Sequence, residues 1–329
     1  MTNYDEIDFS PLLALTEGEV ITHARVRDVR LASGKVLALV TLDNGRDHTR
    51  PNTLGPATMT ALGETLDALK ARAAAGEIDA VAVTGKQYIL AAGADLSDIT
   101  KVGSKANAKL VAQLGHKVFG KLSTLGVPSF AFVNGLALGG GLEIALNSDY
   151  RTVDASAAAI ALPEVFLGII PGWGGAYLLP NLIGIENALE VVISNPLKQN
   201  RMLKPQQAYD YGIFDAIFPA ATYLERSLAW ADGVLTGKIK VERKNQPGKI
   251  ERTVKWPVAI KMARGMLESK IGTVPRSPYV ALDLLDKARS GTKEEGFARE
   301  DEALAGLVTG DQFAASMYAF DLVQKRAKR

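Results

Sequence analysis

Two glutamates stand alone in long uncharged stretches of the sequence. Glu143 is the only ionisable residue between positions 122 and 148, and Glu164 is the only acidic or basic residue between positions 155 and 185. Burying a carboxylate without a partner is costly. Two carboxylates that face one pocket can divide acid and base work when their surroundings separate their pKa values, since burial raises the pKa of a carboxyl group and a helix N-terminus lowers it. We therefore treat Glu143 and Glu164 as candidate catalytic residues.

The stretch before Glu143 has a composition that brings backbone N–H groups close to a ligand. An apolar run, Ser129–Val133, ends in the turn signal Asn134-Gly135, and three glycines, Gly139–Gly141, precede a helical pattern. Glycines let a ligand approach the backbone, and the first N–H groups of a helix have no internal partner. This arrangement suits an anion, or an oxygen that becomes one. The alternative is an ordinary helix start in which the glutamate complements the helix dipole.

A second segment of small residues, Ala91–Leu96, would also let a ligand lie against the main chain. The alternative is a loop that packs tightly for its own reasons. Backbone N–H groups from two such segments could hold a carbonyl oxygen, and donors of this kind contribute about 3 kcal/mol or more to an enolate-like transition state. One carboxylate would then handle a water and the other a proton on carbon. Glycosidases also use two carboxylates, but they usually add aromatic platforms, and this region offers only Trp173.

The elements that must position these residues follow an alternating pattern of strands and helices. Residues 1–20 are expected to form a loosely held arm, and the polar segment 237–253 a linker or solvated crossover. We predict an α/β core over residues 1–236, and a linker with an all-helical region over 237–329. Strands are predicted at 23–30, 36–43, 80–84, 127–133, 150–154, 158–161 and 213–218. Helices are predicted at 57–75, 104–125, 173–183, 185–193, 204–211, 221–236, 258–270, 279–288, 293–308 and 312–327.

The composition is that of an ordinary soluble globular protein, with 329 residues of which 47% are hydrophobic and 22% charged. The net charge of +2 favours neither nucleic acid nor an anionic membrane as a partner. No residue is cysteine, which excludes disulfides, thiolate zinc sites and cysteine nucleophiles and fits a reducing compartment. We expect no signal peptide and no membrane span, because no apolar segment has the required position or length. A cytoplasmic protein is the resulting expectation.

The three histidines, His23, His48 and His116, are scattered along the chain without metal-ligand spacing. We interpret them as surface or packing residues, and we expect no metal site.

Three blocks of this sequence resemble the crotonase, or enoyl-CoA hydratase, superfamily in their order and spacing. They are Ala91–Leu96 (AAGADL), Asn134–Glu143 (NGLALGGGLE) and Pro163–Gly175 (PEVFLGIIPGWGG). One block alone would be weak, but the three together, with both glutamates in place, are highly specific. The resemblance covers about residues 25–235. It implies a spiral of strand–strand–helix (ββα) turns followed by a helical C-terminal part.

The resemblance also implies roles for individual residues. The N–H groups of Ala94 and Gly140 would form an oxyanion hole for the thioester oxygen of an acyl-CoA substrate. Glu143 and Glu164 would hold the attacking water, and Glu164 would also give a proton to the α-carbon or take one from it. Gly172 would lie near that water. The path of the acyl-CoA would be lined by Ala92, Asp95 and Leu96. The family needs no metal and no redox cofactor, since CoA arrives as part of the substrate, and its members assemble as trimers or hexamers.

The C-terminal part is similar to the linker that follows the hydratase half of multifunctional β-oxidation proteins. In those proteins a hydroxyacyl-CoA dehydrogenase comes next, whereas this sequence has no Gly-x-Gly-x-x-Gly dinucleotide fingerprint. We therefore expect a hydratase half on its own, for which a separate dehydrogenase or thiolase could be a partner. The positions that carry this likeness are Arg276–Tyr279, Gly291, Glu295–Phe297, Glu300, Leu307 and Phe320.

Two features depart from the common hydratase pattern. Trp173 replaces a small residue, as it often does in the multifunctional proteins, and the segment Asp47–Leu54 matches the CoA-side loop only loosely. Basic residues of the C-terminal helices are candidates to hold the CoA phosphates: Lys261, Arg264, Lys325 and Arg326.

Three functions are open at this point. The first is a 2-enoyl-CoA hydratase, which both glutamates favour because isomerases of the family typically keep only the one that matches Glu164. The second is a Δ3,Δ2-enoyl-CoA isomerase, or a hydratase with that side activity. The third is a subunit of a β-oxidation complex that has lost turnover, which the intact Glu143 and Glu164 disfavour.

Overall fold

The computed structural model describes residues 3–14 and 16–327, except the side chains of residues 96–98, 324, 325 and 327. The larger of its two sheets has six strands, and its edge begins with an antiparallel hairpin, while all the other neighbours are parallel. Its central strands are buried on both faces, which agrees with their uninterrupted apolar runs. The strands, in their order across the sheet, are β1 (His23–Arg30), β2 (Val36–Asp43), β3 (Ala80–Gly85), β5 (Ser129–Val133), β7 (Tyr150–Asp154) and β9 (Ala216–Phe218).

A second, smaller sheet contains three parallel strands: β4 (Tyr88–Ala91), β6 (Gly135–Leu138) and β8 (Ile160–Ala161). Each follows a strand of the larger sheet in the chain, so the two sheets grow together, one ββ pair at a time. The strands β4 and β6 were not predicted, because their segments contain turn-like residues.

Asn134 explains how such a turn signal can occur between two strands. Its side-chain N–H groups donate to the carbonyls of Gly85 and Lys86, and its oxygen accepts from the N–H of Gly85. The side chain therefore joins two neighbouring corners of the spiral, rather than reversing the chain.

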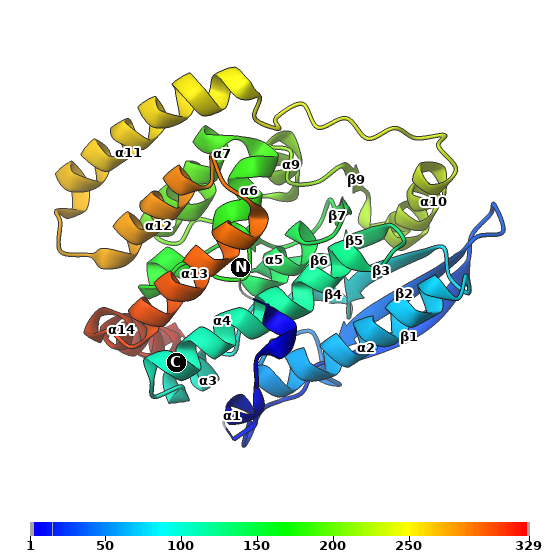
Figure 1. The fold of residues 1–329 in the computed structure, drawn as a ribbon, viewed down its shortest axis with the longest axis horizontal. Coiled ribbons are helices and arrows are strands. Elements are labelled where there is room, and N and C mark those ends of the chain that lie inside the picture. Colours follow the sequence, from blue (N-terminus) through cyan, green and yellow to red (C-terminus); the bar gives the residue numbers. More distant parts are fainter. Residues whose placement is uncertain (1–2, 15, 328–329) are drawn as a thin grey trace.

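The helices follow the ββ pairs and confirm most of the predicted pattern (Figure 1). The predicted helix at 185–193 instead ends early and continues as a π-helix. Up to residue 235 the helices are α2 (Pro56–Ala74), α3 (Leu96–Lys101), α4 (Lys105–Gly120), η2 (Lys121–Thr124), α5 (Gly140–Leu146), η3 (Glu164–Leu167), α6 (Gly175–Ile183), α7 (Ile185–Leu189), η4 (Glu190–Ser194), α8 (Asn195–Leu197), α9 (Pro205–Asp210), η5 (Ala220–Thr222) and α10 (Tyr223–Leu235).

The N-terminal arm is packed against the core, so the expectation of a loose arm is wrong for the residues that the structure describes. It forms η1 (Tyr4–Glu6) and α1 (Ser10–Leu13), and Leu12 is fully buried. The carboxylate of Glu19 accepts hydrogen bonds from two N–H groups at the start of α2, both at 2.9 Å. A buried leucine and a helix-capping carboxylate thus hold a segment whose composition looks polar. Residues 1, 2 and 15 lie outside the described part.

The C-terminal region is helical, as predicted, and covers one side of the spiral (Figure 1). Its helix α13 (Lys293–Val308) packs along α4, and its helix α12 (Arg276–Lys287) packs against α6 and α7. One apolar core includes Leu66 and Leu142 of the spiral together with Trp256 and Leu285 of the C-terminal helices. The division at residues 236 and 237 stays a prediction. The elements of the region are η6 (Glu251–Lys255), α11 (Trp256–Ile271), α12 (Arg276–Lys287), α13 (Lys293–Val308) and α14 (Asp311–Ala327).

No helix within residues 3–14 and 16–327 combines the length and the apolar character that crossing a membrane requires.

Candidate active site

A cavity of about 460 Å³ lies where the loops after β4, β6 and β8 meet the C-terminal helices. Most of its wall is apolar, and the two predicted catalytic carboxylates both reach it. Six of the eight predicted site residues line it: Ala92, Ala94, Gly140, Glu143, Glu164 and Gly172. The structure therefore brings together residues that are up to 80 positions apart in the chain, since the spiral places each loop above the previous one.

The two glycine-rich segments touch each other at the cavity. Gly93 has a φ of +85°, and a Cβ atom added to it would lie 3.0 Å from both the amide nitrogen of Gly140 and the carbonyl oxygen of Leu138. Only glycine permits this approach without moving one segment. Among the described residues, the N–H groups of Ala94 and Gly140 have no acceptor, so both can donate to a ligand.

Glu143 lies in the first turn of α5, and backbone N–H groups of the segment 173–175 bind its carboxylate. Its Oε1 accepts hydrogen bonds from the N–H groups of Trp173 and Gly175, both at 2.8 Å. Burial raises the pKa of Glu143, and the nearby negative charge of Glu300 raises it further, while the two backbone bonds act against this. The two N–H groups favour the ionised form of Glu143.

Glu164 is the first residue of η3 and has fewer partners. Its Oε2 is buried and accepts no hydrogen bond from any described residue. Its Oε1 lies on the side of Gly139, where an added Cβ atom would come within 2.7 Å of that oxygen. Burial raises the pKa of Glu164 well above its ordinary value, and the negative charge of Glu143 adds to this. The arrangement favours a neutral Glu164 beside an ionised Glu143.

Trp173 forms a wall of the cavity over the glycine-rich turn. A Cβ atom on Gly140 would lie 2.5 Å from its Cε3 atom, so the ring covers the start of α5 closely. The indole Nε1–H donates to the carbonyl of Val111 at 3.1 Å, and the ring meets Phe119 edge to face. The large ring thus has a defined place that depends on glycine at position 140.

The remaining predicted residues are placed less centrally. Asp95 lies at two other cavities beside the main one, one of which it shares with Arg46 and Arg50. Leu96 begins α3, but its side chain is outside the described part. Of the basic candidates for the CoA phosphates, Arg264 pairs with Asp283 at 2.5 Å. Three of the candidates have described side chains, and none of these lines the main cavity: Lys261, Arg264 and Arg326.

The sequence did not reveal several residues around the site. Among the described residues that line the cavity, Asn200, Met202 and Leu304 come from segments without a recognisable motif. His116 is fully buried, and its two ring nitrogens face the carboxylates of Glu300 and Asp301. The interpretation as a surface or packing residue therefore missed a charged network. Its signals in the sequence were two adjacent acidic residues within a predicted helix and the place of Glu300 among the positions that resemble the multifunctional proteins.

Within the described part of the chain, no group of histidine, aspartate and glutamate side chains has an arrangement that could hold a metal ion.

Comparison with known sequences gives a consistent set of relatives. A model of the enoyl-CoA hydratase/isomerase family matches residues 32–246. The fatty acid oxidation complex subunit alpha of Pseudomonas putida strain F1 is 32% identical over 273 residues, and that of Shewanella amazonensis is 31% identical over 287 residues. Each alignment covers 78% of this chain but only 37% and 38% of the two relatives, respectively. The chain thus spans just over a third of their length.

Solved structures share the fold. An enoyl-CoA hydratase from Bacillus halodurans has a TM-score of 0.61 at 18% identity, covering 89% of this chain and 99% of that chain. An enoyl-CoA hydratase from Mycobacterium avium subsp. paratuberculosis has a TM-score of 0.59 at 18% identity, covering 92% and 96%. Pseudomonas aeruginosa DspI has a TM-score of 0.54 at 26% identity, covering 80% and 92%. The predicted fold class, an α/β spiral of ββα turns with a helical C-terminal region, is confirmed.

Proposed function

Since the chain belongs to the enoyl-CoA hydratase/isomerase family, we propose that it is a 2-enoyl-CoA hydratase, a lyase that adds water across the 2,3 double bond to give a 3-hydroxyacyl-CoA. The family match confirms the resemblance found in the sequence. The choice of hydration rests on one observation, which is that Glu143 and Glu164 both line one cavity beside two touching glycine-rich segments. Hydration needs two proton-handling groups, and an allylic proton shift needs only one.

In the proposed reaction the two carboxylates begin with one proton between them. The water oxygen bonds to C3 of the enoyl group while Glu143 accepts a proton from that water. Glu164 gives its proton to C2. After the reaction the two carboxylates again hold one proton, which is now on Glu143. Transfer of this proton to Glu164 through water restores the starting state. Two observations support this assignment: Glu143 accepts two N–H bonds, and Oε2 of Glu164 accepts none from the described residues.

The negative charge that develops on the thioester oxygen would be held by the N–H groups of Ala94 and Gly140. Each such donor contributes about 3 kcal/mol to an oxyanion-like transition state. The close contact between their segments supports the proposal, because it fixes the two donors relative to each other. Nothing in this scheme calls for a metal or a redox cofactor, because CoA enters as part of the substrate.

The substrate would run along the cavity from its polar to its apolar side. Ala92 and Gly172 would border the reacting group, and the apolar wall, with Leu304 and Phe320 of the C-terminal helices, would take the acyl chain. We place the CoA end near Asp95 and Leu96. Fatty acid oxidation is the proposed pathway, following the names of the relatives. Assembly as a homotrimer or hexamer, and association with a separate dehydrogenase or thiolase, belong to the same proposal.

The alternative is a Δ3,Δ2-enoyl-CoA isomerase. Glu164 favours it, since a carboxyl group whose Oε2 has no hydrogen-bond partner in the described part of the chain could carry a proton between two carbons.

The test compares two substrates with the purified wild-type chain. We expect crotonyl-CoA to lose its conjugated enoyl-thioester absorbance as water adds. A chain that leaves 2-enoyl-CoAs unchanged but moves the double bond of a 3-enoyl-CoA into conjugation would be an isomerase, and the hydratase proposal would be wrong.

A further inference from the structure

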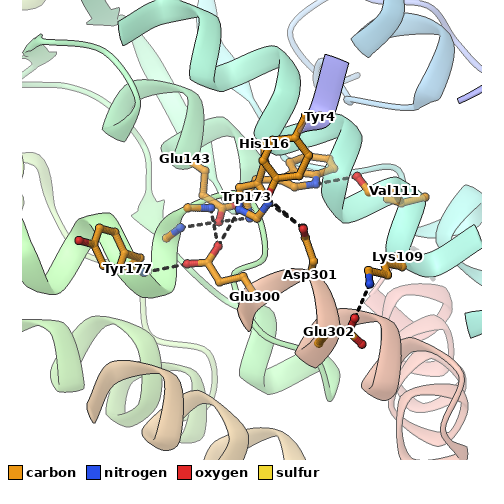
Figure 2. Close-up of polar contacts among 12 residues, drawn as sticks. Tyr4, Lys109, Val111, His116, Glu143, Trp173, Tyr177, Glu300, Asp301 and Glu302 are labelled. Atoms are coloured by element: carbon orange, nitrogen blue, oxygen red, sulfur yellow. Dashed lines mark hydrogen bonds and ion pairs between the residues drawn. The ribbon is translucent and has the colours of Figure 1, made fainter. Parts of the chain in front are cut away.

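The segment from Trp173 to Tyr177 lies between two buried carboxylates (Figure 2). The N–H groups of Trp173 and Gly175 donate to Glu143. The N–H of Gly174 donates to Oε2 of Glu300 at 2.7 Å, and that of Tyr177 donates to its Oε1 at 2.8 Å. The segment's donors are therefore divided between the carboxylate at the cavity and a carboxylate behind it, on α13.

Glu300 belongs to a charged network that the proposed reaction does not use. Its Oε2 lies 3.0 Å from Nε2 of His116 on α4, and Nδ1 of His116 lies 2.8 Å from Oδ1 of Asp301. The hydroxyl of Tyr4 donates to the other oxygen of Asp301 at 3.0 Å, and Phe297 stacks on the imidazole. Glu300, His116 and Asp301 are all almost completely buried.

His116 carries a positive charge in this setting. Each ring nitrogen faces a carboxylate oxygen, and both can be satisfied at once only when both nitrogens bear a proton. Burial alone would lower the pKa of His116, but the two carboxylates outweigh it and raise that pKa to about 9. Burial raises the pKa of Glu300, while His116 and the N–H groups of Gly174 and Tyr177 act against this and favour its ionised form. The network thus places the Glu300 carboxylate, the charged imidazole and the Asp301 carboxylate in a row that begins behind the 173–177 segment.

We propose that Glu300 and His116 are positioning residues that set the charge state of Glu143 through the 173–177 segment, an inference that rests on the proposed role of Glu143. Glu300 accepts from the N–H of Gly174, which stands in the chain between the two N–H groups that hold Glu143. His116 contacts Glu300 from the other side. The negative charge of Glu300 opposes ionisation of Glu143, and the positive charge of His116 favours it. Because all three are buried, water screens these effects little.

The other charged groups around Glu143 have different effects from those of Glu300 and His116. Glu164 faces it from η3, and the negative charge of Glu143 raises the pKa of Glu164, so Glu164 stays neutral while Glu143 is ionised. Asp301 and Tyr4 lie beyond His116 and act mainly by keeping the imidazole charged and in place. Removing Glu300 or His116 should therefore move the titration of Glu143 in opposite directions.

If the network served only to join α13 to α4, removing Glu300 would weaken that helix contact without moving the titration of Glu143. The same two helices carry an exposed pair, Lys109 with Glu302, which joins them without approaching Glu143 (Figure 2). This pair provides a matched control, because Glu302→Gln weakens the same helix contact and changes charge by the same amount.

The experiment measures kcat/KM for crotonyl-CoA against pH, since this profile reports the groups of the free enzyme. Its acid limb marks the protonation of Glu143. We expect Glu300→Gln to move that limb to lower pH by about one unit and His116→Gln to move it to higher pH. Glu302→Gln should leave it in place. Thermal unfolding of each variant shows whether it is folded.

An acid limb that stays in place or rises in folded Glu300→Gln would overturn the inference, even if kcat falls. If His116→Gln does not fold, Glu300→Gln decides alone. A limb that falls in both variants would overturn the part assigned to His116.

A wild type that is inactive on 2-enoyl-CoAs would contradict the proposed function instead. The inference is then tested without turnover, by following the carboxyl carbons of ¹³C-labelled glutamate by NMR over pH, with the Glu143 signal assigned as the one lost in Glu143→Gln. The same direction of shift is expected in Glu300→Gln, and an unchanged titration of that signal would reject the inference.

Discussion

At the scale of single residues, Glu143 and Glu164 share a cavity but differ in what surrounds them. Two N–H groups at 2.8 Å stabilise a negative charge on Glu143, whereas the buried Oε2 of Glu164 receives no such bond from the described residues. Like charges in one dry site also discourage simultaneous ionisation. The difference in hydrogen bonding, rather than in residue type, is what suits one carboxyl group to act as a base and the other as an acid.

The contact between the two glycine-rich segments gives a prediction about Gly93. An added methyl group would push against the amide of Gly140, at 3.0 Å, and separate the two N–H groups proposed to bind the oxyanion. We expect Gly93→Ala to lower kcat/KM by about 100-fold, since misplacement by an ångström can have that effect. The control is Gly34→Ala, in the turn after β1, where φ is +87° and nothing lies within 4 Å of the added atom.

Both alanine variants carry a similar backbone strain of about 1 kcal/mol. Gly93→Ala adds the contact with Gly140 and Leu138, so its free energy of unfolding should fall further than that of Gly34→Ala. Equal activity in the two variants would show that the approach of the segments is unimportant for turnover.

The sequence predicted part of the site because isolation from other charges is visible in a one-dimensional pattern. Glu143 and Glu164 stand out for this reason. His116 does not, since its partners Glu300 and Asp301 are 184 and 185 positions away and their pairing depends on how α13 packs along α4. The residues next to His116 in the sequence do not indicate such distant partners.

At the scale of elements, the buried network between α4 and α13 makes stability depend on pH. The pKa of His116 is raised from 6.5 to about 9 in the folded chain, so its protonated form stabilises the fold fully below pH 6.5 and this contribution is lost as pH rises through about 9. The loss amounts to up to about 3 kcal/mol. Urea unfolding of wild type and His116→Gln between pH 6 and pH 10 measures it, and the decline attributable to His116 should be missing in the variant.

The exposed His23 on β1 provides the control for that measurement, and His23→Gln should decline with pH as wild type does. If His116→Gln also declines as steeply as wild type, the imidazole is not charged in the folded chain.

The N-terminal arm gives a second prediction at this scale. Leu12 is fully buried, while its neighbour Leu13 is 49% exposed. Leu12→Ala should therefore lower the free energy of unfolding by about 2–4 kcal/mol, and Leu13→Ala by less than about 0.5 kcal/mol. Chemical denaturation of the two variants measures this difference. If both variants lose a similar, small free energy of unfolding, the arm is loosely held, as its composition indicated.

The regular pattern of helices could be predicted from the sequence, but two of the three strands of the second sheet could not. Helical spacing of apolar residues repeats over many positions, as in α2 and α13. The strands β4 and β6 are only four residues long and begin beside residues that favour turns. Gly135 shows why: a Cβ atom there would lie 1.9 Å from the carbonyl oxygen of Tyr88, so the glycine serves close strand packing that no local pattern indicates.

At the scale of the whole molecule, the C-terminal helices complete the cavity that the spiral begins. Phe320 of α14 and Leu304 of α13 line it together with residues of the spiral. We expect Phe320→Ala to favour longer substrates, raising the ratio of kcat/KM for a ten-carbon 2-enoyl-CoA over crotonyl-CoA by about tenfold. Tyr318→Ala is the control, because Tyr318 lies on the same helix and is 68% exposed.

An unchanged ratio in Phe320→Ala would place the end of the acyl chain elsewhere in the cavity. The size of the cavity could not be predicted from the sequence, since it depends on where α13 and α14 lie over loops that are more than a hundred residues earlier in the chain.

Turnover of crotonyl-CoA by Glu143→Gln and Glu164→Gln decides whether the two carboxylates share one hydration reaction. Wild type should hydrate the substrate, and each variant should lose roughly 10³-fold or more, because each removes a different proton transfer. Assays of a 3-enoyl-CoA run beside it. If Glu143→Gln keeps wild-type activity while Glu164→Gln loses it, one carboxyl group carries the chemistry and the two-carboxylate account is contradicted.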